Sequence, residues 1–121
     1  NLAVLLMETD QLEEAIKLTT TATEQAPEVA LGWYNLGLMQ RRRGDIAAAI
    51  NAYTKAIQRH PNHPECHQNL AVALLMGGDI DGARNGFRIA LDLLEAQGRN
   101  NEAKALRSQV EGLVKLNEAG R

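Results

Sequence analysis

The chain has 121 residues, the length of one compact domain, and its formal net charge of −2 leaves no basic footprint for a nucleic acid. Hydrophobic residues make up 45 % of it but aromatic residues only 3 %, and no alternating run rich in Val, Ile and Thr predicts a strand. The longest apolar runs, 2–7 and 70–76, are about a third of a membrane span. This composition predicts an all-α protein and argues against nucleic-acid and membrane partners.

The first segment, residues 1–29, contains a string that returns later in the chain. NLAVLLM at 1–7 comes back as NLAVALLM at 69–76, with NLGLM between them, and the spacing of the first asparagine in each string is constant. Four further sets of positions keep the same interval. These sets are Leu2, Leu36 and Leu70; Leu12, Ile46 and Ile80; Ala15, Ala49 and Ala83; and Ala22, Ala56 and Ala90. We therefore expect residues 1–29 to be a copy of the repeat that is cut off inside its first helix, as in a piece of a longer protein. The second helix of this copy should start at a capping box of Asp10 and Glu13.

The segment 30–63 is the best-formed copy. A helix over about 28–42 should end before Gly44, a residue suited to a left-handed turn, and Asp45 then stands where the next helix needs an N-cap, as Asp79 does in the following copy. The segment resembles the tetratricopeptide repeat, a motif of about 34 residues whose pattern is W-x2-L-G-x2-Y, then A-x3-F, then A and P. The matching residues are Trp33, which is expected in the core, Leu36, Gly37, Ala49, Tyr53, Ala56 and Pro61, and the departing one is Gln40.

The segment 64–97 is a further copy. It matches the family pattern at Leu70, Ala71, Leu74, Gly78, Ala83, Phe87 and Ala90. His67 replaces the packing Trp, and Glu95 replaces the helix-ending Pro, so we expect the second helix of this copy to run on to about Gln97. A last helix over about 100–118 carries apolar residues along one side, as the capping helix of a stack needs. These residues are Ala103, Leu106, Val110, Leu113 and Leu116.

Every histidine and the only cysteine lie in HPNHPECH, residues 60–67. His63 and His67 are four residues apart, a spacing at which two imidazoles on one helix can share a metal. However, Pro64 makes His63 a cap or loop residue, His67 takes the packing position, and structural zinc asks for about four ligands. We therefore expect a joint between two repeats, with no metal and no cofactor.

The sequence also gives no support for catalysis. Cys66 has no base aimed at its thiol, and no Gly-rich phosphate loop, paired acids or hydroxyl triad stands out, so we expect no enzymatic activity. A single cysteine cannot form an internal disulfide, which favours a reducing, cytoplasmic location.

The resemblance implies an α-α superhelix, a solenoid of antiparallel helix pairs in which residues 1–121 form one domain and the first helix of each pair lines a concave groove. The candidate groove residues are Asn1, Tyr34, Asn35, Leu38, Arg41, Arg42, Gln68, Asn69, Val72 and Leu75. Asn offers a donor and an acceptor to a peptide backbone, so Asn1, Asn35 and Asn69 resemble the ladder in the superhelix of O-GlcNAc transferases. Asn is also common at this position in the family. Two interpretations therefore stay open: the three residues bind a peptide as a ladder, or they are retained from the family without a binding role.

Charge gives two further indications. Leu31 and Glu65 stand where chaperone-tail binders carry a basic residue, which disfavours the tails of heat-shock chaperones. The run Arg41-Arg42-Arg43 closes a helix and complements its dipole, or alternatively contacts an acidic partner segment.

These patterns predict a protein–protein interaction module that binds an extended peptide or a partner protein in its groove. One rival is a substrate-presenting arm of a larger enzyme, such as a glycosyltransferase. Another is self-assembly: a monomer is favoured, and a homo-oligomer through the truncated N-terminal edge stays open.

Overall fold

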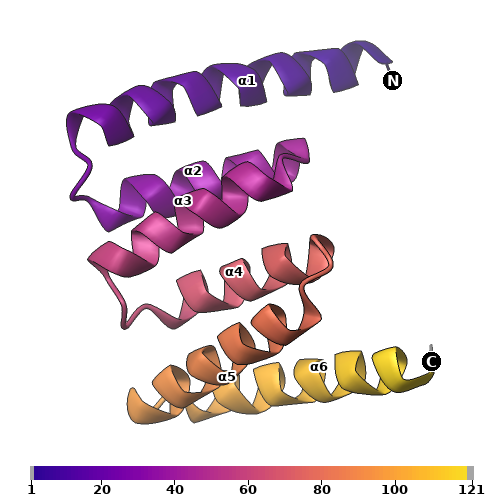
Figure 1. Ribbon diagram of the computed structural model, residues 1–121. Helices are drawn as coiled ribbons and strands as arrows, with labels where there is room; N and C mark the ends of the chain where they lie inside the picture. Colours follow the sequence, from indigo (N-terminus) through magenta and orange to yellow (C-terminus); the bar gives the residue numbers. More distant parts are fainter. Residues whose placement is uncertain (1, 120–121) are drawn as a thin grey trace.

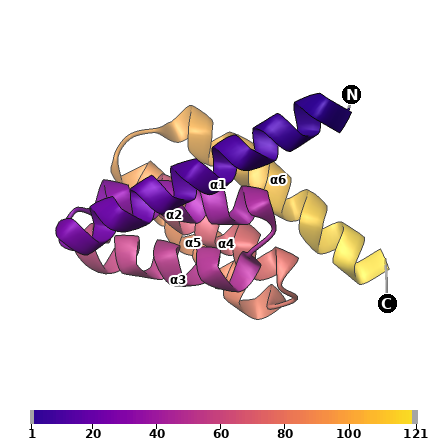
Figure 2. The same ribbon diagram turned by 90° about the horizontal axis from the view of Figure 1, so that it is seen from above.

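The computed structural model describes the backbone of residues 2–119 and the side chains of residues 10–113, and no strand occurs among the described residues. The chain forms α1 (Leu2–Gln25), α2 (Ala30–Arg43), α3 (Ile46–Arg59), α4 (Pro64–Met76), α5 (Ile80–Ala96) and α6 (Asn100–Ala119). The helices stack in chain order, with α2 against α3 and α4 against α5 as the most closely packed pairs (Figure 1). Seen from above, the end helices α1 and α6 run in different directions, which reflects the twist of the stack (Figure 2).

Helix α1 runs without a break through the position where a turn between two helices was expected. The predicted capping box at Asp10 and Glu13 is therefore wrong, because no helix begins there. In the next two repeats the turn is made by Gly44 and Gly78, whose φ angles are 100° and 90°. The residue at the corresponding position of the first copy is Asp10, for which a left-handed turn is costly, so the helix continues.

The ends of the other helices follow the predicted signals closely. Helix α2 starts at Ala30, slightly later than expected, and the N–H groups of Gly44 and Asp45 close its end by bonding to carbonyls of the last turn. Helix α5 ends at Ala96 with Gln97 as its C-cap, and α6 starts at Asn100.

The two predicted aspartate caps behave differently. The Asp79 carboxylate accepts a hydrogen bond of 2.9 Å from the Gly82 N–H and caps α5 as predicted. Asp45 precedes α3, but its carboxylate binds the Arg43 guanidinium instead of an N–H of α3. Asp45 therefore occupies the predicted N-cap position of α3, but its side chain does not cap the helix, since a charged partner two residues away takes its carboxylate.

The core lies between the helix pairs and repeats with the sequence. Among residues 10–113 it forms three clusters, whose buried members are Ile16, Leu36 and Ala52; Ala49, Tyr53, Ala56, Cys66 and Ala73; and Ala71, Ala83, Phe87, Ala90, Leu94, Ala103 and Leu106. Small residues sit at the crossings: a Cβ on Gly37 would lie 2.7 Å from the Tyr53 ring, and one on Gly86 would lie 3.0 Å from Ala71.

Helix α6 packs along α5 and closes the stack at its C-terminal end (Figure 1). Ala103 and Leu106 are buried in the last cluster and Val110 packs against it, whereas Leu113 is exposed. The side chain of Leu116 lies outside the described residues.

His67 and Trp33 pack as the repeat register predicts. His67 is buried, and its Nε2 atom lies 2.8 Å from the Pro61 carbonyl oxygen, so the ring ties α4 to the preceding turn. Trp33 packs against two of the core clusters and donates its indole N–H to the Pro27 carbonyl at 2.8 Å. The Lys55 ammonium lies 4.4 Å from the centre of the Trp33 ring and covers part of it.

Candidate partner-binding face

The described groove candidates all lie on α2 and α4, which contact each other directly, and Asn1 lies outside the described residues. Helical spacing puts four residues of α2 and three of α4 on one side of each helix. They are Leu31, Asn35, Leu38 and Arg42, and Asn69, Val72 and Met76. Together with Tyr34, Arg41, Gln68 and Leu75, these residues are called the α2–α4 face below.

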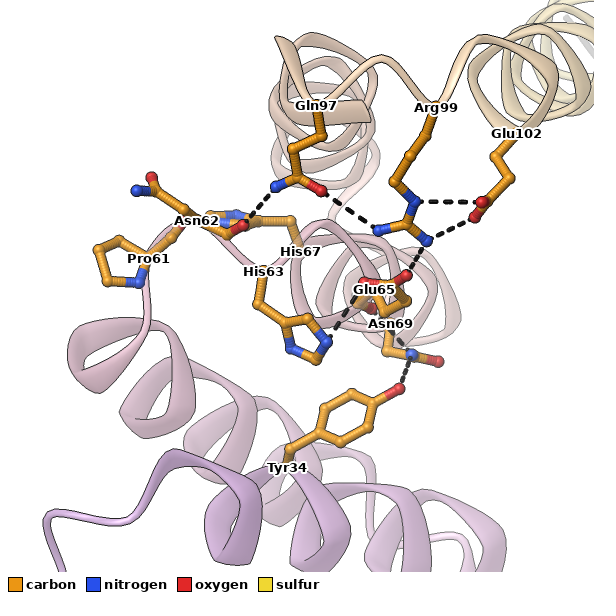
Figure 3. Close-up of polar contacts among 10 residues, drawn as sticks. All are labelled: Tyr34, Pro61, Asn62, His63, Glu65, His67, Asn69, Gln97, Arg99 and Glu102. Atoms are coloured by element: carbon orange, nitrogen blue, oxygen red, sulfur yellow. Dashed lines mark hydrogen bonds and ion pairs between the residues drawn. The ribbon is translucent and has the colours of Figure 1, made fainter. Parts of the chain in front are cut away.

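Asn69 links the two helices. Its Nδ2 atom donates to the Tyr34 hydroxyl and to the Glu65 carbonyl, each at 2.9 Å (Figure 3). Its Oδ1 atom accepts from Arg41 at 3.1 Å. The amide therefore already uses both its donor and its acceptor side within the protein. Asn35, by contrast, is exposed on α2. A peptide would have to displace these bonds to reach Asn69, whereas Asn35 is accessible.

An acidic and basic cluster borders the face beside α6. The Glu65 carboxylate accepts from Arg99, which also binds Glu102, and His63 Nε2 lies 3.2 Å from Glu65 Oε2 (Figure 3). The hydrogen bond from Arg99 holds the pKa of Glu65 below its ordinary value. Sequence reasoning missed the role of Arg99, although Arg99 stands one repeat length after Glu65.

The apolar candidates divide into packed and exposed ones. Leu38, Val72 and Leu75 are partly buried against the core clusters, so they offer less surface to a partner than expected. Leu31 at the start of α2 and Met76 at the end of α4 are 62 % and 58 % exposed. The apolar contact area of the face is therefore concentrated near these two helix ends.

A small pocket opens beside Leu31, where α2, α3 and the turn before α4 meet. Its volume is about 190 Å³, and we call it the imidazole pocket. It is lined by Ala30, Leu31, Tyr34, Ala56, His60 and His63. A second pocket, of about 200 Å³, is lined by Gln68, Leu94, Glu102, Ala105, Leu106 and Gln109 between α4, α5 and α6.

The basic run at the end of α2 is only partly engaged. Arg43 pairs with Glu13 of α1 and with Asp45, and Arg41 bonds to Asn69. Arg42 is exposed on the α2–α4 face.

The chemistry of the described side chains offers little for metal binding or nucleophilic attack. In that part of the chain no three His, Cys, Asp or Glu side chains gather as a metal would need. Cys66 is buried, and burial raises the pKa of its thiol to about 12, so the thiol stays protonated at neutral pH. No described helix has the length and apolar character needed to cross a bilayer.

The backbone of residues 2–119 forms six helices that stack in antiparallel pairs. Their glycine turns and buried alanines recur at the constant interval of the sequence repeat, and this arrangement defines a helical-repeat solenoid. Two family models of the tetratricopeptide repeat match the chain, over residues 40–110 and 1–64. The chain belongs to the tetratricopeptide repeat family.

Similar proteins come from several organisms. The probable biofilm formation methyltransferase WspC of Pseudomonas putida is 42 % identical over 60 residues, which are half of this chain and 14 % of WspC. The chain spans between 14 % and 50 % of the length of the first curated relatives it matches.

Among solved structures, the type III secretion translocator chaperone SycD of Yersinia enterocolitica has a TM-score of 0.82 at 20 % identity, covering 97 % of this chain and 81 % of SycD. SycD with a peptide of the translocator YopD reaches 0.72 at 18 % identity, covering 91 % and 87 %. The TPR2B domain of yeast Sti1 in complex with an Hsp70 peptide reaches 0.75 at 20 % identity, covering 84 % and 82 %. At these identities the likeness shows the fold.

Proposed function

We propose that the chain is a protein-interaction module that binds an extended segment of another protein across its α2–α4 face. The observation that carries the proposal is the exposure of three side chains on the two adjacent helices. Leu31 and Asn35 are exposed on α2 and Met76 is exposed on α4, among polar residues of the face. Exposed apolar side chains rimmed by hydrogen-bonding groups are typical of peptide-binding surfaces. The peptide complexes of SycD and Sti1 support the same kind of partner for this fold.

The chemistry of the face indicates a segment with apolar side chains and some acidic character. Leu31 and Met76 would take the apolar side chains, and Arg42 would attract an acidic one. Asn35 would bond to the backbone of the segment, contributing about 0.5–1.5 kcal/mol for each useful hydrogen bond. Asn69 holds α2 and α4 in register, so its role would be to support the face rather than to contact the segment.

A peptide array tests the proposal. Binders selected from unrelated peptides are measured by fluorescence anisotropy against the parent chain and against Asn35→Ala and Arg42→Glu. We expect each variant to weaken binding by roughly two- to tenfold with an unchanged melting curve. The matched controls are Asn85→Ala and Arg88→Glu, on exposed positions of α5. If only the α5 variants weakened peptide binding, the binding site would lie on another surface and the proposal would be contradicted.

We also infer that the chain acts without a catalytic centre, a cofactor or a metal of its own. The buried, protonated thiol of Cys66 supports this, as does the lack of a gathered ligand set among the described side chains. Binding as an arm of a larger enzyme is compatible with this proposal, since the matched part of WspC is a small share of a protein named as a methyltransferase. The free buried cysteine also supports a reducing, cytoplasmic location.

Self-assembly is a second candidate, favoured by one face of α1. Ala22 is exposed, whereas Ala56 and Ala90, at the same repeat position, are 2 % and 0 % exposed. The neighbouring Leu18 is 65 % exposed. We propose that another copy of the chain covers this exposed face of α1. Sedimentation velocity tests this candidate: a dimer that Leu18→Glu dissociates supports it, and a monomer at every concentration contradicts it.

A further inference from the structure

The imidazole pocket has a size and lining that the proposed peptide binding does not yet explain. Its volume of about 190 Å³ is too small for a drug-sized ligand, whose sites have roughly 300–1,000 Å³. An apolar cavity of about 150 Å³ in another protein is known to hold one benzene ring. The pocket therefore has the size of one side chain of a bound segment.

Three of the six residues that line the pocket carry aromatic rings. The His60 and His63 rings stack in parallel, with centroids 5.5 Å apart and planes 3° apart. The Tyr34 ring meets His63 edge-on, with centroids 5.2 Å apart and planes at 69°. Ala30 and Ala56 add small apolar patches, and the exposed Leu31 stands at the rim.

Three polar contacts hold this wall in place. His63 Nε2 lies 3.2 Å from Glu65 Oε2, and Arg99 holds the other oxygen of the same carboxylate. The Tyr34 hydroxyl accepts from Asn69, which fixes the second ring (Figure 3). The His63 and Tyr34 rings are thus oriented before any partner arrives, which lowers the entropic cost of binding.

We propose that the imidazole pocket receives one aromatic side chain of the segment that the α2–α4 face binds. An aromatic ring fits the volume and finds both ring faces and ring edges to pack on. The preference for an aromatic side chain holds in either charge state of the histidines. A neutral imidazole stacks on an aromatic ring, and a protonated imidazole attracts the π face of that ring. A carboxylate is disfavoured by Glu65, whose charge lies directly behind His63. This inference rests on the proposed function and names the anchor residue of its partner.

Three small probes separate ring chemistry from size. N-acetyl-phenylalanine amide, N-acetyl-cyclohexylalanine amide and N-acetyl-leucine amide are titrated separately into the chain, with the imidazole signals of His60 and His63 followed by NMR. Buried His67 serves as the internal reference. Because aromatic pairing adds to simple burial, we expect the phenylalanine probe to bind roughly two- to tenfold more tightly than its saturated analogue. Equal affinity of the two would overturn the proposal, as would imidazole signals of His60 and His63 that do not shift with any probe.

Variants of the outer wall complete the test. His60→Ala removes an exposed stacking partner and should abolish the preference for the phenylalanine probe, while His60→Phe should keep it. The matched control is Gln58→Ala, an exposed position near the end of α3. A preference that survives His60→Ala would contradict the proposal. If Asn35→Ala weakens the binding of array-selected peptides and His60→Ala does not, only the pocket inference fails. If His60→Ala weakens their binding and Asn35→Ala does not, the proposed function fails and the pocket inference stands.

Discussion

At the residue scale, the structure depends on small side chains where two helices cross. Ala49 and Ala83 are 0 % and 2 % exposed at equivalent crossings. Enlarging either to Leu should overpack the crossing and lower the free energy of unfolding by about 1–3 kcal/mol. Urea denaturation measures this, with Ala47→Leu on the exposed side of α3 as the control. A neutral Ala49→Leu would show that the crossing is looser than described.

A second residue-scale prediction concerns pH and the Glu65–Arg99 pair. The pKa of Glu65 lies below its ordinary 4.5 because Arg99 donates to the carboxylate. The stabilisation is therefore present above the ordinary pKa and is lost as the pH falls through the lowered one. Glu65→Gln should destabilise the chain at neutral pH, and the difference in urea midpoint should shrink in acid. A difference that stays constant with pH would mean that the charge of Glu65 contributes nothing.

Residue roles were only partly predictable from the sequence. The buried alanines and His67 follow from the repeat register, because register alone decides which side of a helix meets its neighbour. The engagement of Asn69 does not follow from it, since it depends on where the Tyr34 hydroxyl and the Arg41 guanidinium lie in space. The role of Arg99 was missed for the same reason: although Glu65 stands one repeat length earlier, the contact depends on where the two side chains lie in space.

At the element scale, helix starts differ in how they are capped. Asp79 bonds to an N–H of α5, whereas Asp45 gives its carboxylate to Arg43. Asp79→Ala should therefore cost about 0.5–2 kcal/mol of unfolding free energy. Asp45→Ala should cost less, because it removes only an exposed ion pair. Paired urea titrations compare the two, and equal losses would contradict the difference in capping.

The continuity of α1 is the main element-scale feature that the sequence did not predict. The repeat pattern continues through residues 1–29, but the glycine that makes each later turn is Asp10 in this copy. A register argument transfers helix positions from copy to copy, whereas a turn depends on the one residue that must take a left-handed conformation. The end of α2, the end of α5 and the start of α6 were predicted within a few residues, because Gly44 stands at the turn after α2 and Gly98 at the turn between α5 and α6.

For the whole molecule, composition predicted the all-α class, and the resemblance to the tetratricopeptide repeat implied the stacking of helix pairs. The apolar side of residues 100–118 predicted the closing helix α6. The exposed fraction of each apolar residue on the α2–α4 face does not follow from the sequence pattern. Leu38, Val72 and Leu75 turn partly into the core, while Leu31 and Met76 remain exposed. Local periodicity finds the side of a helix that faces a neighbour, but the exposed area on that side depends on how the neighbouring pairs twist.

The central claim is that the α2–α4 face binds an extended segment, and hydrogen–deuterium exchange tests it most directly. The chain is compared alone and with an array-selected peptide at saturation. We expect slower amide exchange on α2 and α4, centred on Leu31, Asn35 and Met76, with α3 and α5 little changed. Protection confined to α1, or to α3 and α5, would contradict the claim.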